Sequence, residues 1–273
     1  MKKFSVRFLA TLAILYCLAL AALFSLQRSV LYIPPSIYLT PTGVNLNGAI
    51  EVTHPEHPNS LLGWWMPPKK DDAPVVLFFH GNGSAVYSNY DIYSALHMKG
   101  IGVFALAYPG YPGGPSLKTT QDSLTAAAIE GYDYVARQGI DADKIVFYGT
   151  SLGAGIAAQL TQHRRTSIII MEAPFTSAAD MAQLRFPIFP AAALTKDKFK
   201  SDKALARSDI PLLWLHGTHD RVIPFHIGET LFEAYGGPKA AYKFDGGQHT
   251  NIWYVGGREI IMDRLAALRR PAD

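Results

Sequence analysis

The chain has 273 residues, of which 49% are hydrophobic and 17% charged, and its formal net charge is +3. This length and apolar content allow one large domain with a substantial core, and the 12% of aromatic residues argues against disorder. The net charge is small for the length and the basic residues are scattered, which argues against a nucleic-acid-binding protein.

An apolar segment lies near the N-terminus. Residues 8–26 carry no charge, and about 20 apolar residues are enough to span a bilayer as a helix. We therefore predict a membrane anchor over residues 1–28, or alternatively a signal peptide cleaved at an Ala-x-Ala motif. The positive charges at Lys2, Lys3 and Arg7 favour a cytosolic N-terminus. The domain that follows is then expected on the non-cytoplasmic side, in a periplasm or lumen, or secreted after cleavage.

The rest of the chain, residues 29–273, is predicted to form one domain. Residues 44–65 contain two β-rich segments separated by turn formers, which predicts an antiparallel hairpin. From residue 75 onward, short apolar runs alternate with segments of helical period, which is typical of a parallel sheet covered by helices. The predicted strands are residues 75–79, 103–107, 144–148, 167–171, 212–215 and 241–244. The predicted helices are residues 91–98, 123–137, 152–162, 227–235 and 251–269.

Residues 175–208 interrupt this alternation. They contain the run Phe186-Pro187-Ile188-Phe189-Pro190 and a cluster of lysines. One interpretation is a lid-like insertion that arches over the carboxyl edge of the sheet, where ligands bind in open α/β folds. The other is an ordinary surface connection.

Ser151 lies in the pentapeptide Gly149-Thr150-Ser151-Leu152-Gly153. The pentapeptide directly follows the strand predicted at 144–148 and opens into a predicted helix, which is the setting that a Gly-x-Ser-x-Gly motif needs. Small flanking residues allow a strained turn that lifts the hydroxyl above the sheet. We therefore predict that Ser151 is the nucleophile of a serine hydrolase, the alternative being a glycine-rich helix start without chemistry.

A serine hydroxyl needs a base to take its proton, and that base is commonly a histidine held by a carboxylate. His249 is the predicted base because it lies in a glycine-rich loop between the last strand and the last helix. The other histidines near the preceding strand are interpreted as loop-packing or solvated side chains: His216, His219 and His226.

Asp220 is the predicted acid because it follows the strand at 212–215 and precedes His249, giving the order serine, acid, histidine. Glu172, at the end of the strand before, and Asp245, beside the glycine loop, remain rivals. Attack on an ester develops negative charge on oxygen, which fixed N–H groups stabilise. His80-Gly81-Asn82-Gly83 follows a strand, so the predicted donors are the N–H of Asn82, or alternatively of Gly83, and the N–H of Leu152. His80 itself is expected to bond to backbone.

Several further runs accompany these motifs: Leu31-Tyr32, Gly63-Trp64-Trp65, Tyr108-Pro109-Gly110-Tyr111, Glu172-Ala173-Pro174-Phe175 and His216-Gly217-Thr218-His219-Asp220. Together the motifs resemble the α/β-hydrolase superfamily after about residue 27, and within it a membrane-anchored branch that includes depalmitoylating hydrolases. The resemblance implies the α/β-hydrolase fold and a catalytic triad of Ser151, Asp220 and His249. The chain departs from the branch at Tyr111-Pro112-Gly113-Gly114, where the branch usually has Tyr-Gly followed by serine.

The predicted function is hydrolysis of a carboxylic ester or thioester through an acyl-enzyme, without a cofactor or metal. The only cysteine, Cys17, lies in the apolar segment, so a disulfide within the chain and a cysteine-based metal site are both excluded. A membrane anchor favours a lipid-like or membrane-bound acyl substrate. The alternatives are a peptidase of the prolyl-oligopeptidase type, disfavoured because no propeller domain is recognised, and a hydrolase-like scaffold that binds without turnover.

Overall fold

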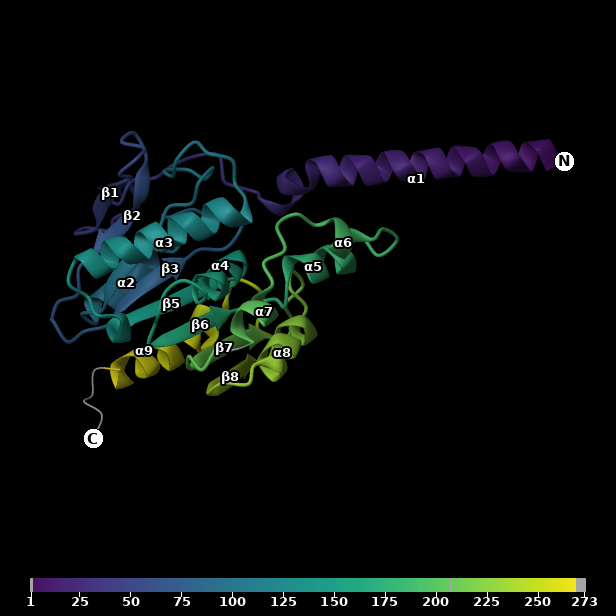
Figure 1. Cartoon of the computed structure of the whole chain (residues 1–273). Helices are drawn as coiled ribbons and strands as arrows, with labels where there is room; N and C mark the ends of the chain where they lie inside the picture. The colour runs from purple at the N-terminus through teal and green to yellow at the C-terminus, as the bar shows by residue number, and fades with distance from the viewer. Residues whose placement is uncertain (1, 207, 269–273) are drawn as a thin grey trace.

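A computed structural model describes residues 2–206 and 208–268 of the chain (Figure 1). Eight strands form one sheet in the order β1-β2-β4-β3-β5-β6-β7-β8. The pairs β1–β2 and β2–β4 are antiparallel and all others are parallel, which confirms both the predicted hairpin and the mostly parallel sheet. The strands are β1 Ile50–Thr53, β2 Leu61–Met66, β3 Val75–Phe79, β4 Gly102–Leu106, β5 Ile145–Thr150, β6 Ile168–Glu172, β7 Leu212–Gly217 and β8 Lys239–Phe244.

Helices cover both faces of the sheet, as the alternation of apolar runs predicts. Alternate residues of β3 enter different core clusters: Leu77 packs in one and Phe78 in the other, and both side chains are fully buried. The helices α3, α4, α7 and α8 lie on the first face, and α2 and α9 on the second (Figure 1). Their bounds are α2 Tyr90–Met98, α3 Gln121–Arg137, α4 Leu152–Leu160, α7 Ser201–Leu205, α8 Phe225–Ala234 and α9 Gly257–Ala267.

Most predicted strands and helices begin or end one or two residues from the observed bounds, and two differences have a clear structural cause. The single helix predicted at 251–269 is wrong, because a 3-10 turn η3, Ile252–Val255, is separated from α9 by Gly256 at φ +120°. Residue 269 lies outside the described residues. Strand β8 begins two residues before its predicted start because it lies at the edge of the sheet, where most of its side chains are exposed and give no continuous apolar run.

A long N-terminal helix, α1 (Lys2–Leu31), projects from the domain (Figure 1). Its segment Val6–Leu31 is long and apolar enough to cross a membrane. The C-terminal half of α1 lies beside the 175–208 region, which contains α5 (Ala178–Arg185) and α6 (Ala191–Leu194) before α7. This region is therefore built of three short helices placed between β6 and β7.

Gly153, in the first turn of α4, is packed against the end of β3. A Cβ atom at this position would lie 2.0 Å from the carbonyl oxygen of Phe79, which is backbone and cannot swing away. We expect Gly153→Ala to destabilise the full chain by roughly 1–3 kcal/mol through overpacking, or to prevent folding. Thermal unfolding followed by circular dichroism in detergent micelles measures the effect. Gly236→Ala is the control, since a Cβ there meets nothing within 4 Å; equal melting of the two variants would contradict this packing.

Candidate active site

Ser151 occupies the tight turn between β5 and α4. Its backbone has φ 53° and ψ −116°, a left-handed conformation that costs a residue with a side chain about 1–3 kcal/mol. The turn is held from the neighbouring strand, because the N–H of Ser151 donates to the carbonyl oxygen of Glu172 at 2.9 Å. At Gly149 a Cβ would lie 2.3 Å from the carbonyl oxygen of Gly153, so the crossing of strand and helix requires glycine.

The structure brings Ser151, His249 and Asp220 together in one hydrogen-bonded chain. His249 Nε2 lies 3.0 Å from Ser151 Oγ, and His249 Nδ1 lies 2.7 Å from Asp220 Oδ2. Because a carboxylate only accepts hydrogen bonds, Nδ1 carries the proton and donates to Asp220. In the neutral imidazole with its proton on Nδ1, Nε2 can accept the proton of the Ser151 hydroxyl.

The Asp220 carboxylate is buried and fixed by several donors. Its Oδ1 accepts hydrogen bonds from the N–H groups of Val222 and Ile223 at 2.8 and 2.9 Å. Burial alone would raise the pKa of Asp220, but hydrogen bonds from His216, His249 and the Ile223 backbone lower it well below its usual value. Asp220 is therefore ionised at neutral pH and suited to stabilise a protonated His249.

His216 has a role at the site that the sequence analysis missed. Its side chain is fully buried, and its Nε2 lies 3.2 Å from Asp220 Oδ2 and 2.9 Å from the carbonyl oxygen of Ile223. Both neighbours are acceptors, so Nε2 carries the proton and donates to them. His216 packs against the loop that follows β7, as one of the two interpretations had it, but it is not solvated and it also contacts Asp220. His219 and His226 are exposed. The available signal was its position near the end of the fully buried strand β7, four residues before Asp220.

The two other candidates for the catalytic acid, Asp245 and Glu172, are not hydrogen-bonded to His249 in the described structure. Asp245 is exposed. Glu172 is buried at the end of β6, where its carboxylate accepts a hydrogen bond from the Tyr148 hydroxyl at 2.7 Å. Burial raises the pKa of Glu172 to about 7, although the Tyr148 hydrogen bond and the nearby His249 lower it in part.

The two predicted oxyanion donors approach Ser151 from different elements. Leu152 begins α4, whose first N–H groups have no partner within the helix. Asn82 follows β3, and a Cβ built at the adjacent Gly81 would lie 3.6 Å from Ser151 Cβ, so this loop borders the nucleophile. The arrangement can present N–H groups of Asn82 and Leu152 to an oxygen bound at Ser151.

The Asn82 side chain connects this loop to the end of α1, a contact that the sequence did not indicate. Its Nδ2 donates to the Leu31 carbonyl oxygen at 2.5 Å, and its Oδ1 accepts from the Ile33 N–H at 3.0 Å and the Tyr111 hydroxyl at 2.7 Å. His80 is structural, as expected: its Nδ1 lies 2.9 Å from the Gly81 carbonyl oxygen, and burial lowers its pKa to about 4. The candidate oxyanion loop is therefore fixed to the chain that leaves α1.

Residues 76–218, more than half of the chain, match the model of the Alpha/beta hydrolase family. The chain belongs to this family. A relative from Mycobacterium tuberculosis, described as uncharacterized, is 27% identical over 89% of this chain and 87% of its own length. The lysophosphatidylserine lipase ABHD12 of Xenopus tropicalis is 30% identical over 63% of this chain, which spans about half of that lipase, 49%.

Solved structures of other hydrolases share the fold. The Pyrococcus furiosus esterase Pf2001 superposes with a TM-score of 0.65 at 16% identity, covering 87% of this chain and 97% of the esterase. The Pyrococcus horikoshii acylaminoacyl peptidase also gives a TM-score of 0.65, at 17% identity, but only 40% of that chain is covered. The family match and the lipase relative support hydrolase activity for this chain. The solved structures are under 25% identical to it and support only the shared fold.

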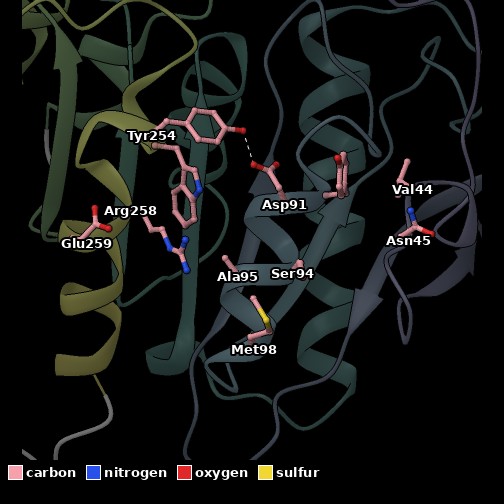
Figure 2. A pocket seen from close by; sticks show the side chains of 11 residues that line it. Val44, Asn45, Asp91, Ser94, Ala95, Met98, Tyr254, Arg258 and Glu259 are labelled. Atoms are coloured by element: carbon pink, nitrogen blue, oxygen red, sulfur yellow. Dashed lines mark hydrogen bonds between the residues drawn. The ribbon is translucent and has the colours of Figure 1, made fainter.

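A separate pocket of this hydrolase lies between α2 and the C-terminal elements (Figure 2). Asp91, Tyr254 and Arg258 line it, and the Tyr254 hydroxyl donates to Asp91, as the dashed line shows. Ser151 and His249 are not among its lining residues. The Tyr254–Asp91 bond ties the turn that follows His249 to α2. Among residues 2–206 and 208–268, no three histidine, cysteine or acidic side chains converge on a metal-binding arrangement.

The raised pKa of Glu172 predicts a pH-dependent stability. Below a pH of about 4.5 this group is protonated in both states; from there to about 7 the unfolded chain loses the proton while the folded chain keeps it. Between these pH values, Glu172 lowers the free energy of unfolding by up to about 1.4 kcal/mol for each unit of rising pH. Above pH 7 its contribution to the free energy of unfolding stays constant.

We expect Glu172→Gln to remove this component, so that its unfolding free energy changes less than that of the unchanged chain between pH 4.5 and 7. Denaturant titrations at several pH values measure the difference. Glu56→Gln, at an exposed glutamate, is the matched control. Parallel pH profiles for Glu172→Gln and the unchanged chain would contradict a protonated, buried Glu172.

Proposed function

We propose that this hydrolase cleaves carboxylic esters or thioesters through an acyl-enzyme formed on Ser151. The observation that carries the proposal is the chain of hydrogen bonds from Asp220 through His249 to Ser151, at 2.7 and 3.0 Å. This is the geometry in which a base activates a serine hydroxyl while a carboxylate keeps the base in the required tautomer.

In the first half of the proposed reaction, Ser151 Oγ attacks the carbonyl carbon of the substrate as His249 Nε2 takes the hydroxyl proton. Negative charge then develops on the carbonyl oxygen, which the N–H groups of Asn82 and Leu152 stabilise. His249 returns the proton to the leaving alcohol or thiol, and the carbon–oxygen or carbon–sulfur bond breaks. Asp220 stays ionised and stabilises the transient imidazolium.

In the second half, water replaces the leaving group. His249 takes a proton from the water as its oxygen attacks the acyl carbon, and the same N–H groups hold the second tetrahedral intermediate. Return of the proton to Ser151 Oγ releases the carboxylic acid. All groups required belong to the side chains and backbone of the described site.

We further propose that α1 anchors the domain in a membrane and that the substrate is a lipid-like or membrane-bound acyl ester or thioester. Support comes from the 26-residue apolar segment Val6–Leu31 and from a lipase among the relatives. The basic residues ahead of this segment outnumber the single Arg28 at its end, which favours a catalytic domain on the non-cytoplasmic side.

Replacing Ser151 by alanine tests the nucleophile. We expect Ser151→Ala to lose labelling by a fluorophosphonate and to lower kcat for p-nitrophenyl acyl esters by about 10⁴-fold or more, because the attacking oxygen is gone. Gel fluorescence and absorbance assays on the full chain in detergent measure both. Ser60→Ala is the matched control and should keep both activities. Full labelling of Ser151→Ala would disprove the assignment.

The acid is tested by comparing two substitutions of the same kind. Asp220→Asn removes the acceptor that keeps the proton on His249 Nδ1, so we expect kcat to fall by about 10⁴-fold. Asp245→Asn, at the exposed rival, should leave kcat within about twofold. If Asp245→Asn is the variant with the large loss, the roles of the two aspartates are reversed from those proposed.

A further inference from the structure

An apolar hairpin follows α5 on the outside of the domain and includes α6. Residues 186–194 contain no charged residue, while Arg185 precedes them and Lys196 follows closely. Ile188, near the tip of this segment, is 75% exposed. We call residues 186–194 the apolar hairpin. An exposed apolar segment of this kind is typical of a site that binds a partner of low polarity.

The apolar hairpin contacts α1 between Tyr16 and Gln27, in the part of the helix nearest the domain (Figure 1). The Tyr16 hydroxyl donates to the Ile188 carbonyl oxygen at 3.2 Å, and its ring stacks on Phe189 with centroids 5.1 Å apart. Further along α1, Gln27 Nε2 donates to the Leu194 carbonyl oxygen at 3.3 Å. The tip thus lies beside the middle of α1 and the base beside its end.

The rise per residue of a helix gives the depth at which Tyr16 would lie in a bilayer. The segment Val6–Leu31 has 26 residues and is about 39 Å long, which places Tyr16 about 15 Å from Val6. The hydrocarbon core of a bilayer is about 30 Å thick. If α1 crosses the bilayer perpendicular to its plane, the hydrocarbon layer can begin at most about 9 Å beyond Val6 and still end within the segment. Tyr16 then lies at least about 6 Å inside the hydrocarbon. The tip that contacts Tyr16 must lie at the same depth.

The backbone of the tip is prepared for an apolar environment. Pro187 and Pro190 have no N–H, and the N–H groups of Phe186 and Phe189 donate within the hairpin and α5, at 2.9 and 3.1 Å. Gln183 Nε2 donates to the Phe189 carbonyl oxygen at 3.0 Å, and Tyr16 supplies the donor for Ile188. Hydrocarbon admits irregular backbone only where such groups are satisfied by protein. Within residues 186–190 of the described chain, the Ile188 N–H is the one backbone group without a protein partner.

Charged groups lie where the headgroups would be. Arg28, at the end of α1, makes a two-bond ion pair with Asp197 at 2.6 and 3.0 Å. Lys196 Nζ lies 4.0 Å from the ring centroid of Phe24. These contacts join the last turns of α1 to the base of the apolar hairpin, at a level where charged side chains reach water and phosphate.

We propose that the apolar hairpin, residues 186–194, inserts into the bilayer beside α1 and binds lipid acyl chains. The inference rests on the membrane anchor in the proposed function but not on the chemistry of Ser151. The region holding the hairpin leaves the sheet after β6, the strand whose last residue accepts the N–H of Ser151. The candidate site is therefore held at the membrane surface, where an acyl ester can reach it from the bilayer.

Depth-dependent quenching tests the insertion. The full chain carrying Cys17→Ser receives one new cysteine, labelled with the fluorophore NBD and reconstituted into phosphatidylcholine vesicles with or without doxyl-labelled lipid. The positions are Ile188→Cys in the hairpin, Leu15→Cys on α1 and Met98→Cys on α2, all exposed side chains. We expect quenching at positions 188 and 15 to exceed that at position 98 by at least threefold. Fluorophosphonate labelling of each variant reports separately on the hydrolase site.

Each other outcome has a defined meaning. Quenching at position 15 but not at 188 would overturn the insertion and leave the anchor in place. A blue-shifted but unquenched probe at 188 would mean that protein, such as a second copy of the chain, covers the hairpin, and would also overturn it. No quenching at either position would overturn both the anchor and the insertion. Quenching at 188 without fluorophosphonate labelling would support the insertion and count only against the proposed chemistry.

Discussion

The left-handed turn at Ser151 is the constraint on which the rest of the site depends. A residue with a side chain adopts φ 53° only where the surroundings enforce it. Here the enforcement comes from close packing: β5 ends against α4 at Gly149, and α4 begins against β3 at Gly153, with no room for a Cβ at either glycine. Burial of the central strands offsets the strain at Ser151. The strained turn places the Ser151 hydroxyl at the carboxyl edge of the sheet.

The same edge connects the candidate site to the N-terminal helix. Asn82, a candidate oxyanion residue, bonds through its side chain to the backbone on both sides of the end of α1. Asp197 pairs with Arg28 of α1 and also accepts the N–H of Gln121, at the start of α3. Two independent contacts therefore fix how the domain faces the helix. With α1 in a bilayer, as proposed, these contacts would hold one edge of the domain toward the membrane.

The sequence predicts the mostly parallel sheet, the alternation of strands and helices along the chain, and the three residues that meet at the site. These features depend on local signals in the sequence. Apolar runs of five residues, as at Val75–Phe79, identify buried strands, and a glycine-flanked serine after such a run identifies the turn. Contacts made by side chains from remote segments have no such signal. The bond from Tyr16 to Ile188 joins residues 172 positions apart, and that from Asn82 to Leu31 joins residues 51 apart. The break at Gly256 was missed because the residues around it continue a helical pattern.

The central claim is that Ser151 is the residue that becomes acylated. The most direct measurement is peptide mapping by mass spectrometry after the full chain reacts with a fluorophosphonate. The account predicts one phosphonyl group per chain, on the peptide that contains Ser151, with loss of esterase activity in the same proportion. A phosphonyl group on a different residue, or complete loss of activity without modification of Ser151, would contradict it.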